Sequence, residues 1–156
     1  MSICPDRAGT IDEGGRMSES RYALTMSRAE EERSEGRPQT ALLLFRKAVK
    51  EAQNFAEQIH AARLAAELHL ELEQVEEAFE ALRLPVRECE RTVAMDAEAG
   101  VVLRLFAELV EERRQVNWRI DAEWAWARAL EIARLHGDAA EAERAEAGLA
   151  EYRRVI

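Results

Sequence analysis

Gly36-Arg-Pro-Gln-Thr-Ala41-Leu-Leu-Leu-Phe45-Arg-Lys-Ala48-Val49 is the stretch of sequence that decides the fold. Gly36 suits the end of one helix, and Pro38 suits the first turn of the next, because its missing N–H has no helical partner there. Within this second helix one apolar stripe runs along a single face: Ala41, Phe45, Ala48 and Val49. The stretch therefore predicts two helices joined by a tight turn.

The same order of small and large residues recurs twice further along the chain. The second copy is Ala78, Leu82, Pro85 and Val86, and the third is Ala122, Trp126, Ala129 and Leu130. The copies begin at Ala41, Ala78 and Ala122, which are 37 and then 44 residues apart. Small residues let a partner helix come close, and the large residue fills the space beside them. We therefore expect repeated helix pairs with the small residues, Phe45, Leu82 and Trp126 buried.

Almost every residue from Ser18 onward follows a helical period. The turn signals are Gly36-Arg37-Pro38 and His136-Gly137-Asp138, where Asp138 suits an N-cap, together with weaker breaks between them. These breaks predict seven helices, near residues 19–34, 38–53, 55–72, 75–94, 98–116, 119–135 and 138–154.

Composition and charge exclude several classes of function. The net charge is −9, from 31 acidic and 22 basic residues, whereas nucleic acid and anionic lipid both require a basic face. No apolar run is long enough to cross a membrane. We expect a cytoplasmic protein that binds neither nucleic acid nor membrane. Residues 1–16 lack an apolar period and predict a disordered tail before a domain at 17–156, with Met17 as a candidate initiator.

The stretch from Gly36 to Val49 resembles the turn and second helix of the tetratricopeptide repeat (TPR) family. The resemblance implies an all-α fold, a right-handed α-solenoid of about three TPR-like helix pairs plus a C-terminal capping helix. Both repeat spacings are longer than the usual period of about 34 residues. The family's Trp-Leu-Gly-Tyr signature is degraded here, and the proline that closes each repeat is missing.

Pro85 departs from the repeat, because it stands where the pattern calls for alanine. An interior proline removes a backbone hydrogen bond and costs about 3 kcal/mol. Two outcomes remain open: a helix over 75–94 that is kinked near Arg83, or a break at Leu84–Pro85 with the second repeat out of register.

The sequence contains no signature of catalysis or of cofactor binding. It lacks a glycine-rich phosphate loop, a paired-cysteine metal motif and His-Glu-x-x-His, and no two of its three histidines share a helical turn. We predict no enzyme activity, no cofactor and no metal site. Acidic runs such as Glu30–Glu32 lie near arginines and predict solvated ion pairs.

Three tryptophans cluster near the sixth predicted helix. Trp126 belongs to the buried stripe. Trp118 and Trp124 leave two alternatives open: they pack against the terminal helix, or they form an exposed aromatic anchor for a partner.

The family resemblance also implies a concave groove lined by the first helix of each pair, which binds a partner segment. The family's groove positions, carried over through the alignment of Ala41, Ala78 and Ala122, imply these candidate partner-binding residues: Met26, Glu30, Arg33, His60, Arg63, Glu67, Leu70, Arg104, Glu111 and Arg114. We predict an interaction module for a protein or peptide partner. The alternative is a structural helical protein that forms homo-oligomers through its C-terminal helices and has no peptide groove in use.

Overall fold

The computed structural model describes residues 10–11, 17–18, 20–89 and 96–155. The fold is all-α, and these residues form seven helices: α1 (Arg21–Ser34), α2 (Pro38–Glu51), α3 (Phe55–Glu71), α4 (Val75–Cys89), α5 (Ala97–Arg113), α6 (Trp118–Leu135) and α7 (Ala139–Val155). All seven correspond to predicted helices. The predicted end of the fourth, 90–94, lies outside the described residues.

A two-residue antiparallel pair precedes the helices. In it β1 (Thr10–Ile11) pairs with β2 (Met17–Ser18). This pair was not predicted, since the sequence has no alternating run there. The other residues of the predicted tail, 1–9 and 12–16, lie outside the part of the chain that the structure describes.

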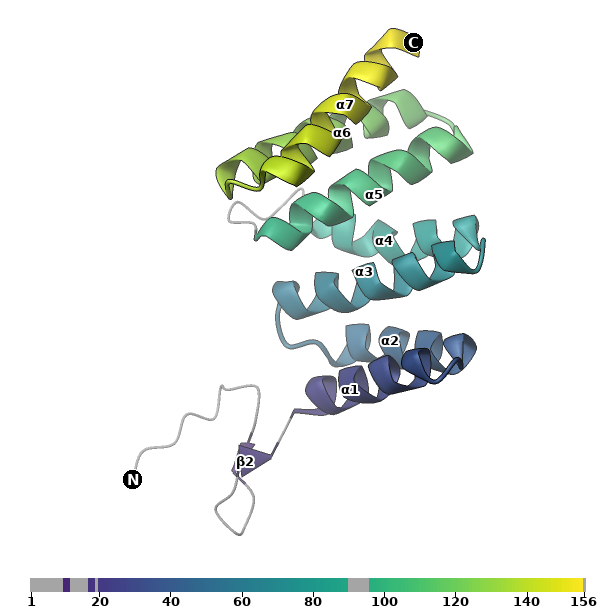
Figure 1. Ribbon diagram of the computed structural model, residues 1–156, viewed down its shortest axis with the longest axis vertical. Coiled ribbons are helices and arrows are strands. Elements are labelled where there is room, and N and C mark those ends of the chain that lie inside the picture. The colour runs from purple at the N-terminus through teal and green to yellow at the C-terminus, as the bar shows by residue number, and fades with distance from the viewer. Residues whose placement is uncertain (1–9, 12–16, 19, 90–95, 156) are drawn as a thin grey trace.

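The helices stack in chain order along the long axis of the molecule, as Figure 1 shows. Each helix packs against the next one in the chain, and α5 also contacts α3 and α7. In this view α1, α3, α5 and α7 lie nearer the viewer than α2, α4 and α6 (Figure 1). The odd-numbered helices therefore share one side of the stack.

The repeated stripe is buried as predicted. The residues Ala41, Phe45, Ala48, Ala78, Leu82, Ala122, Trp126 and Ala129 are all at most 4% exposed. They belong to two hydrophobic clusters. The N-terminal core cluster joins α1, α2 and α3 around Phe45, and the C-terminal core cluster joins α3 to α7 around Leu82 and Trp126. Burial of this apolar surface is the main force that holds the stack together.

Pro85 lies inside α4, which continues unbroken from Val75 to Cys89. The alternative of a break at Leu84–Pro85 is therefore wrong. Pro85 and its stripe neighbour Val86 are both buried, which keeps the second repeat in the predicted register. Helix α4 packs against both α3 and α5, and we infer that this packing offsets the backbone hydrogen bond lost at Pro85.

The turns after α1, α3 and α5 repeat one backbone conformation. Gly36, Glu73 and Asn117 have φ values of 80°, 59° and 64°. Their spacing is that of Ala41, Ala78 and Ala122, so equivalent positions of the three repeats share the left-handed conformation. At the end of α3, Gln74 N donates to His69 O at 2.8 Å. This hydrogen bond is typical of a helix C-cap that has a residue in the left-handed conformation.

Glu73→Gly should stabilise the protein by about 1 kcal/mol. A non-glycine residue in the left-handed region costs roughly 1–2 kcal/mol, part of which the greater freedom of glycine in the unfolded chain cancels. Glu73 is exposed, and among the described residues its side chain forms no hydrogen bond or ion pair that the change would remove. Urea unfolding of the variant measures the gain. Gly36→Ala is the matched control and should lose stability, and an unchanged midpoint for both would contradict the argument.

Tyr22 links α1 to α3 through its hydroxyl, which donates to Glu57 O at 3.0 Å. Burial, reinforced by the charges of Glu57 and Glu98, raises the pKa of Tyr22 from 10.0 to about 12. A raised pKa in the folded state gives stability that is full below the unfolded value and is lost as the pH rises through the folded one.

Tyr22→Phe should therefore flatten the loss of unfolding free energy between pH 10 and pH 12, the window set by this pKa shift. Urea titrations across that range measure the slope. Tyr152 is the only other tyrosine and remains in the variant as an internal comparison. An alkaline slope that is the same in both proteins would contradict the assignment.

Candidate functional site

A hollow opens on the side of the stack formed by the odd-numbered helices. We call it the groove cavity. Its volume is about 400 Å³, and α3, α5 and α7 all contribute to its lining: His60, Arg63, Glu67, Ala97, Glu98, Val101, Arg104, Asp138, Glu141 and Arg144. Three helices that are separate in sequence thus build one concave surface.

Glu98 of α5 ties α3 to α5 at one end of the groove cavity. Its Oε2 accepts from Arg63 Nε at 2.5 Å and lies 2.8 Å from His60 Nδ1. Arg63 also donates to Glu67 at 2.8 Å. Burial works against the charged form of Arg63, but its hydrogen bonds and the two carboxylates together outweigh it, so the pKa of Arg63 is raised. Its charge is therefore fixed across the physiological pH range.

Arg104 of α5 makes the corresponding link to α7. Its Nε and Nη2 donate to the two oxygens of Glu141 at 2.8 and 3.2 Å, in a bidentate pair. Its Nη1 donates to Glu108 at 3.0 Å, and Arg144 donates to Glu141 at 3.2 Å. Burial opposes the charge of Arg104, while these partners raise the pKa of Arg104 overall. The walls of the cavity are therefore a network of mutually neutralised charges.

Helix caps position both acidic partners. Asp96 Oδ1 accepts from Ala99 N at 3.2 Å and starts α5, which places Glu98 in its first turn. Asp138 Oδ1 accepts from Glu141 N at 3.1 Å, so the predicted N-cap at Asp138 is confirmed. Each cap fixes a first-turn glutamate against an arginine of the preceding odd-numbered helix.

Four of the ten predicted groove residues line the cavity: His60, Arg63, Glu67 and Arg104. Arg104 is largely covered by its partners, since its side chain is only 12% exposed. Arg114 is not among the residues that line the groove cavity. Arg114 ends α5 with φ 49°, and its guanidinium stands over the Trp118 ring at 5.2 Å.

The other predicted residues lie outside the cavity lining. Met26 is buried in the N-terminal core cluster, so its side chain packs rather than facing a groove. Leu70 is half-buried against the C-terminal core cluster. Arg33 pairs with Glu71 at 2.5 Å, and Glu30 is exposed. Glu111 accepts a hydrogen bond from Trp126 Nε1. Met26 and Leu70 have core roles because the groove face and the core face adjoin on these helices.

Several lining residues were missed by sequence reasoning, notably Glu98, Glu141 and Arg144. Helix α7 belongs to no helix pair in the predicted repeat, so the repeat alignment does not include its face. A signal was nevertheless present. An arginine is followed by a glutamate about one repeat later in Arg33–Glu71, Arg63–Glu98 and Arg104–Glu141. Such a recurrence marks the contacts between successive odd-numbered helices.

The three tryptophans divide between core and surface. Trp126 is buried, as predicted, while Trp118 and Trp124 are half-buried against the C-terminal core cluster. The Trp118 ring meets Tyr152 of α7 edge-on, with centroids 6.0 Å apart. Of the two alternatives, packing against the terminal helix therefore holds for Trp118.

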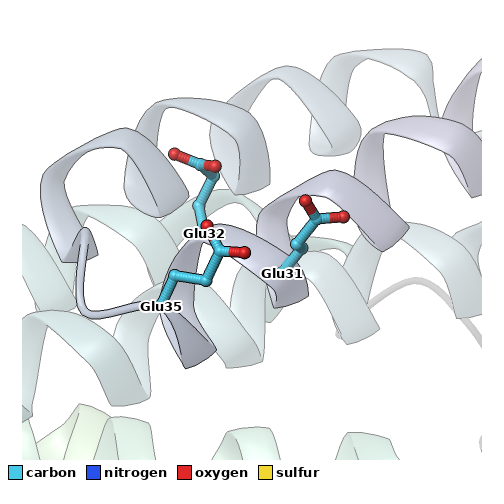
Figure 2. Close-up of side chains that lie close together, drawn as sticks. All are labelled: Glu31, Glu32 and Glu35. Carbon is cyan, nitrogen blue, oxygen red and sulfur yellow. The ribbon is translucent and has the colours of Figure 1, made fainter.

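Figure 2 shows three carboxylates, Glu31, Glu32 and Glu35, close together at the end of α1. Arg37 donates to Glu32 at 2.7 and 2.8 Å and also donates to Glu35. The hydrogen bond from Arg37, more than any other influence, lowers the pKa of Glu32. This arrangement matches the predicted ion pairs and gives the cluster an arginine partner within the chain.

The groove cavity offers hydrogen-bond donors and acceptors but, among its described lining residues, no thiol or hydroxyl nucleophile. Along the described helices, none is both long and apolar enough to pass through a bilayer. No protein-family model matches this chain in sequence, and no curated protein does.

Proposed function

We propose that this protein is a protein-interaction module that holds a segment of a partner protein in the groove cavity. The observation that carries the proposal is the common lining of one 400 Å³ hollow by α3, α5 and α7. A concave face built by successive helix pairs is the surface that helical-repeat proteins use to bind extended or helical peptides. In this proposal the protein has no enzymatic activity and requires no cofactor.

The proposal includes a TPR-like architecture: a right-handed solenoid of the pairs α1–α2, α3–α4 and α5–α6, closed by α7. It is supported by the equivalent left-handed turns at Gly36, Glu73 and Asn117 and by the buried stripe in α2, α4 and α6. The long second spacing, from Ala78 to Ala122, includes residues 90–95, which lie outside the described part of the chain.

The groove cavity favours a partner segment that carries both charged and neutral polar groups. Its arginines already have carboxylate partners, so a purely acidic segment would have to displace Glu98 or Glu141 from Arg63 or Arg104. Removing one partner from a half-buried pair costs several kcal/mol, whereas adding a hydrogen bond to an intact pair costs little. Arg144 is the exception, because its side chain is 65% exposed and can turn toward a ligand. We expect moderate affinity with a modest dependence on salt.

Ala97→Trp should abolish partner binding without unfolding the protein. Ala97 is an exposed residue of the cavity lining at the start of α5, so an indole there fills the hollow and leaves the ion pairs intact. Ala139→Trp is the matched control, since Ala139 holds the same place after the Asp138 cap and does not line the cavity. Both variants place tryptophan at the first position of a helix, so any loss of helix stability should be the same in the two.

The measurement is photo-crosslinking in cells that naturally make the protein. A photoreactive phenylalanine at position 97 should capture a partner that the same residue at position 139 does not. Once that partner is purified, calorimetry compares the two tryptophan variants with the parent. Equal binding by parent and Ala97→Trp would show that the groove cavity is not the binding surface.

The alternative function, self-association through the C-terminal helices, is favoured by a different observation. Helix α7 closes the stack and exposes a set of small side chains: Ala139, Ala140, Ala147 and Ala150. Small residues allow a second helix to approach closely. Light scattering over a range of protein concentrations separates the two functions. Self-association is favoured over partner binding if the molecular mass of the protein rises with its concentration and the Ala147→Arg variant remains a monomer.

A further inference from the structure

A second cavity of about 400 Å³ lies between α2, α3 and α4, away from the groove cavity. We call it the Arg46 cavity. It is lined by Arg46 of α2, His69 of α3, and Glu76, Glu77, Glu80 and Ala81 of α4. This volume falls in the range of about 300–1,000 Å³ that is usual for small-molecule sites. Neither the repeat pattern nor the proposed function uses these residues.

The charges around the Arg46 cavity are incompletely paired. Glu76 is held by Arg113 at 2.6 Å, and Glu80 lies 3.4 Å from Arg83. Arg46 and Glu77 form no ion pair with any residue in the described ranges, although they line the same cavity. Most other arginines of the helices have a carboxylate partner. The Arg46 cavity is therefore lined by one cationic side chain, Arg46, and one anionic side chain, Glu77, that do not form an ion pair with each other.

His69 adds a buried acceptor to the acidic side. The residue is only 8% exposed, and its Nδ1 lies 2.8 Å from Gln74 Oε1. An amide oxygen only accepts, so Nδ1 is the donor in this contact, and in that tautomer Nε2 can accept a hydrogen bond from a ligand. No residue of the described chain hydrogen-bonds to Nε2. The cavity therefore combines donors from Arg46 with acceptors from Glu77 and His69.

We propose that the Arg46 cavity binds a small zwitterion, a molecule with an amine at one end and a carboxylate at the other. The carboxylate meets the Arg46 guanidinium, which binds such groups in a bidentate way. The ammonium group meets Glu77 and donates to His69 Nε2. A divalent metal is a poorer fit, since the described ligand atoms of His69, Glu76, Glu77 and Glu80 do not converge to within 4.8 Å in any set of three.

The experiment uses the full chain and three probes of matched length: 4-aminobutyrate, butylamine and butyrate. Calorimetry should show that 4-aminobutyrate binds at least about tenfold more tightly than either one-ended probe, because only it neutralises both sides of the cavity. Glycine and 6-aminohexanoate bracket the length. An optimum within this series reports the distance between the two charged walls.

Arg46→Gln and Glu77→Gln should each weaken 4-aminobutyrate binding by about tenfold or more, while Arg87→Gln, at an exposed position of α4 outside the cavity, should not. Both cavity positions are exposed, so the variants keep the core intact. The inference is overturned if butylamine binds as well as 4-aminobutyrate, or if no probe binds at millimolar concentration. It is also overturned if a double-mutant cycle without ligand shows that Arg46 and Glu77 stabilise each other directly.

Discussion

Trp126→Ala should lower the free energy of unfolding by about 3–5 kcal/mol, the usual cost of truncating a buried aromatic side chain. Trp126 is 4% exposed and connects three helices: it belongs to α6, its Nε1 donates to Glu111 of α5, and its ring packs on α7. The variant leaves a cavity and a glutamate without its partner. Urea unfolding followed by circular dichroism measures the loss.

Phe45→Ala tests the same argument in the N-terminal core cluster, where Phe45 is fully buried. We expect a loss of about 3–5 kcal/mol here too. Leu43→Ala is the matched control, because Leu43 lies on the same helix with 65% of its surface exposed and should lose less than about 1 kcal/mol. A loss below about 1 kcal/mol in both aromatic variants would reject the repeat register.

Gly148→Ala should destabilise the protein by about 1–3 kcal/mol through overpacking. Within a helix, Gly→Ala normally raises the free energy of unfolding by about 0.5–1 kcal/mol. A decrease at Gly148 would therefore indicate a steric clash. A Cβ at Gly148 would stand 2.2 Å from Cη2 and 2.3 Å from Cζ3 of Trp126. The indole is rigid and packed between helices, so it cannot turn aside as a flexible side chain would.

The coupling to Trp126 can be measured directly. In a Trp126→Phe background the shorter ring leaves room at position 148, so Gly148→Ala should cost less there than in the parent protein. Ala147→Gly, at the exposed neighbouring position, should lose about 0.5–1 kcal/mol for the ordinary reason of helix propensity. Equal effects of Gly148→Ala in both backgrounds would contradict the close approach.

The sequence predicted the seven helices and their core stripe well, because both depend on local period. Ala41, Ala78 and Ala122 are all buried, and the turn signals at Gly36 and Gly137 end α1 and α6. The left-handed conformation of Glu73 gave no local signal, since glutamate is an unusual residue there. The left-handed conformation of Glu73 could be inferred only from the repeat alignment, in which Glu73 is equivalent to Gly36.

The candidate site was predicted less completely, because it depends on contacts between helices. The alignment found His60, Arg63, Glu67 and Arg104 by their repeat positions. It could not show that Glu98 and Glu141 would neutralise the arginines, as both glutamates follow N-caps whose exact placement sets their direction. It also placed Met26 in the groove, although the rotation of α1 turns that side chain into the core.

The stacking of the helices in chain order has a consequence for synthesis on the ribosome. Among the hydrogen bonds between described side chains, the largest sequence separation is 38 residues, which occurs in Arg33–Glu71 and in His60–Glu98. The contacts of each helix are therefore with segments that are close in sequence. We expect α1 and α2 to pack together with α3 as soon as α3 has left the ribosome, and each later helix to pack on the helix that precedes it. Because α3 contributes to both core clusters, we expect stable packing to begin once α3 has emerged. Folding of this kind is fast and leaves little apolar surface exposed to chaperones.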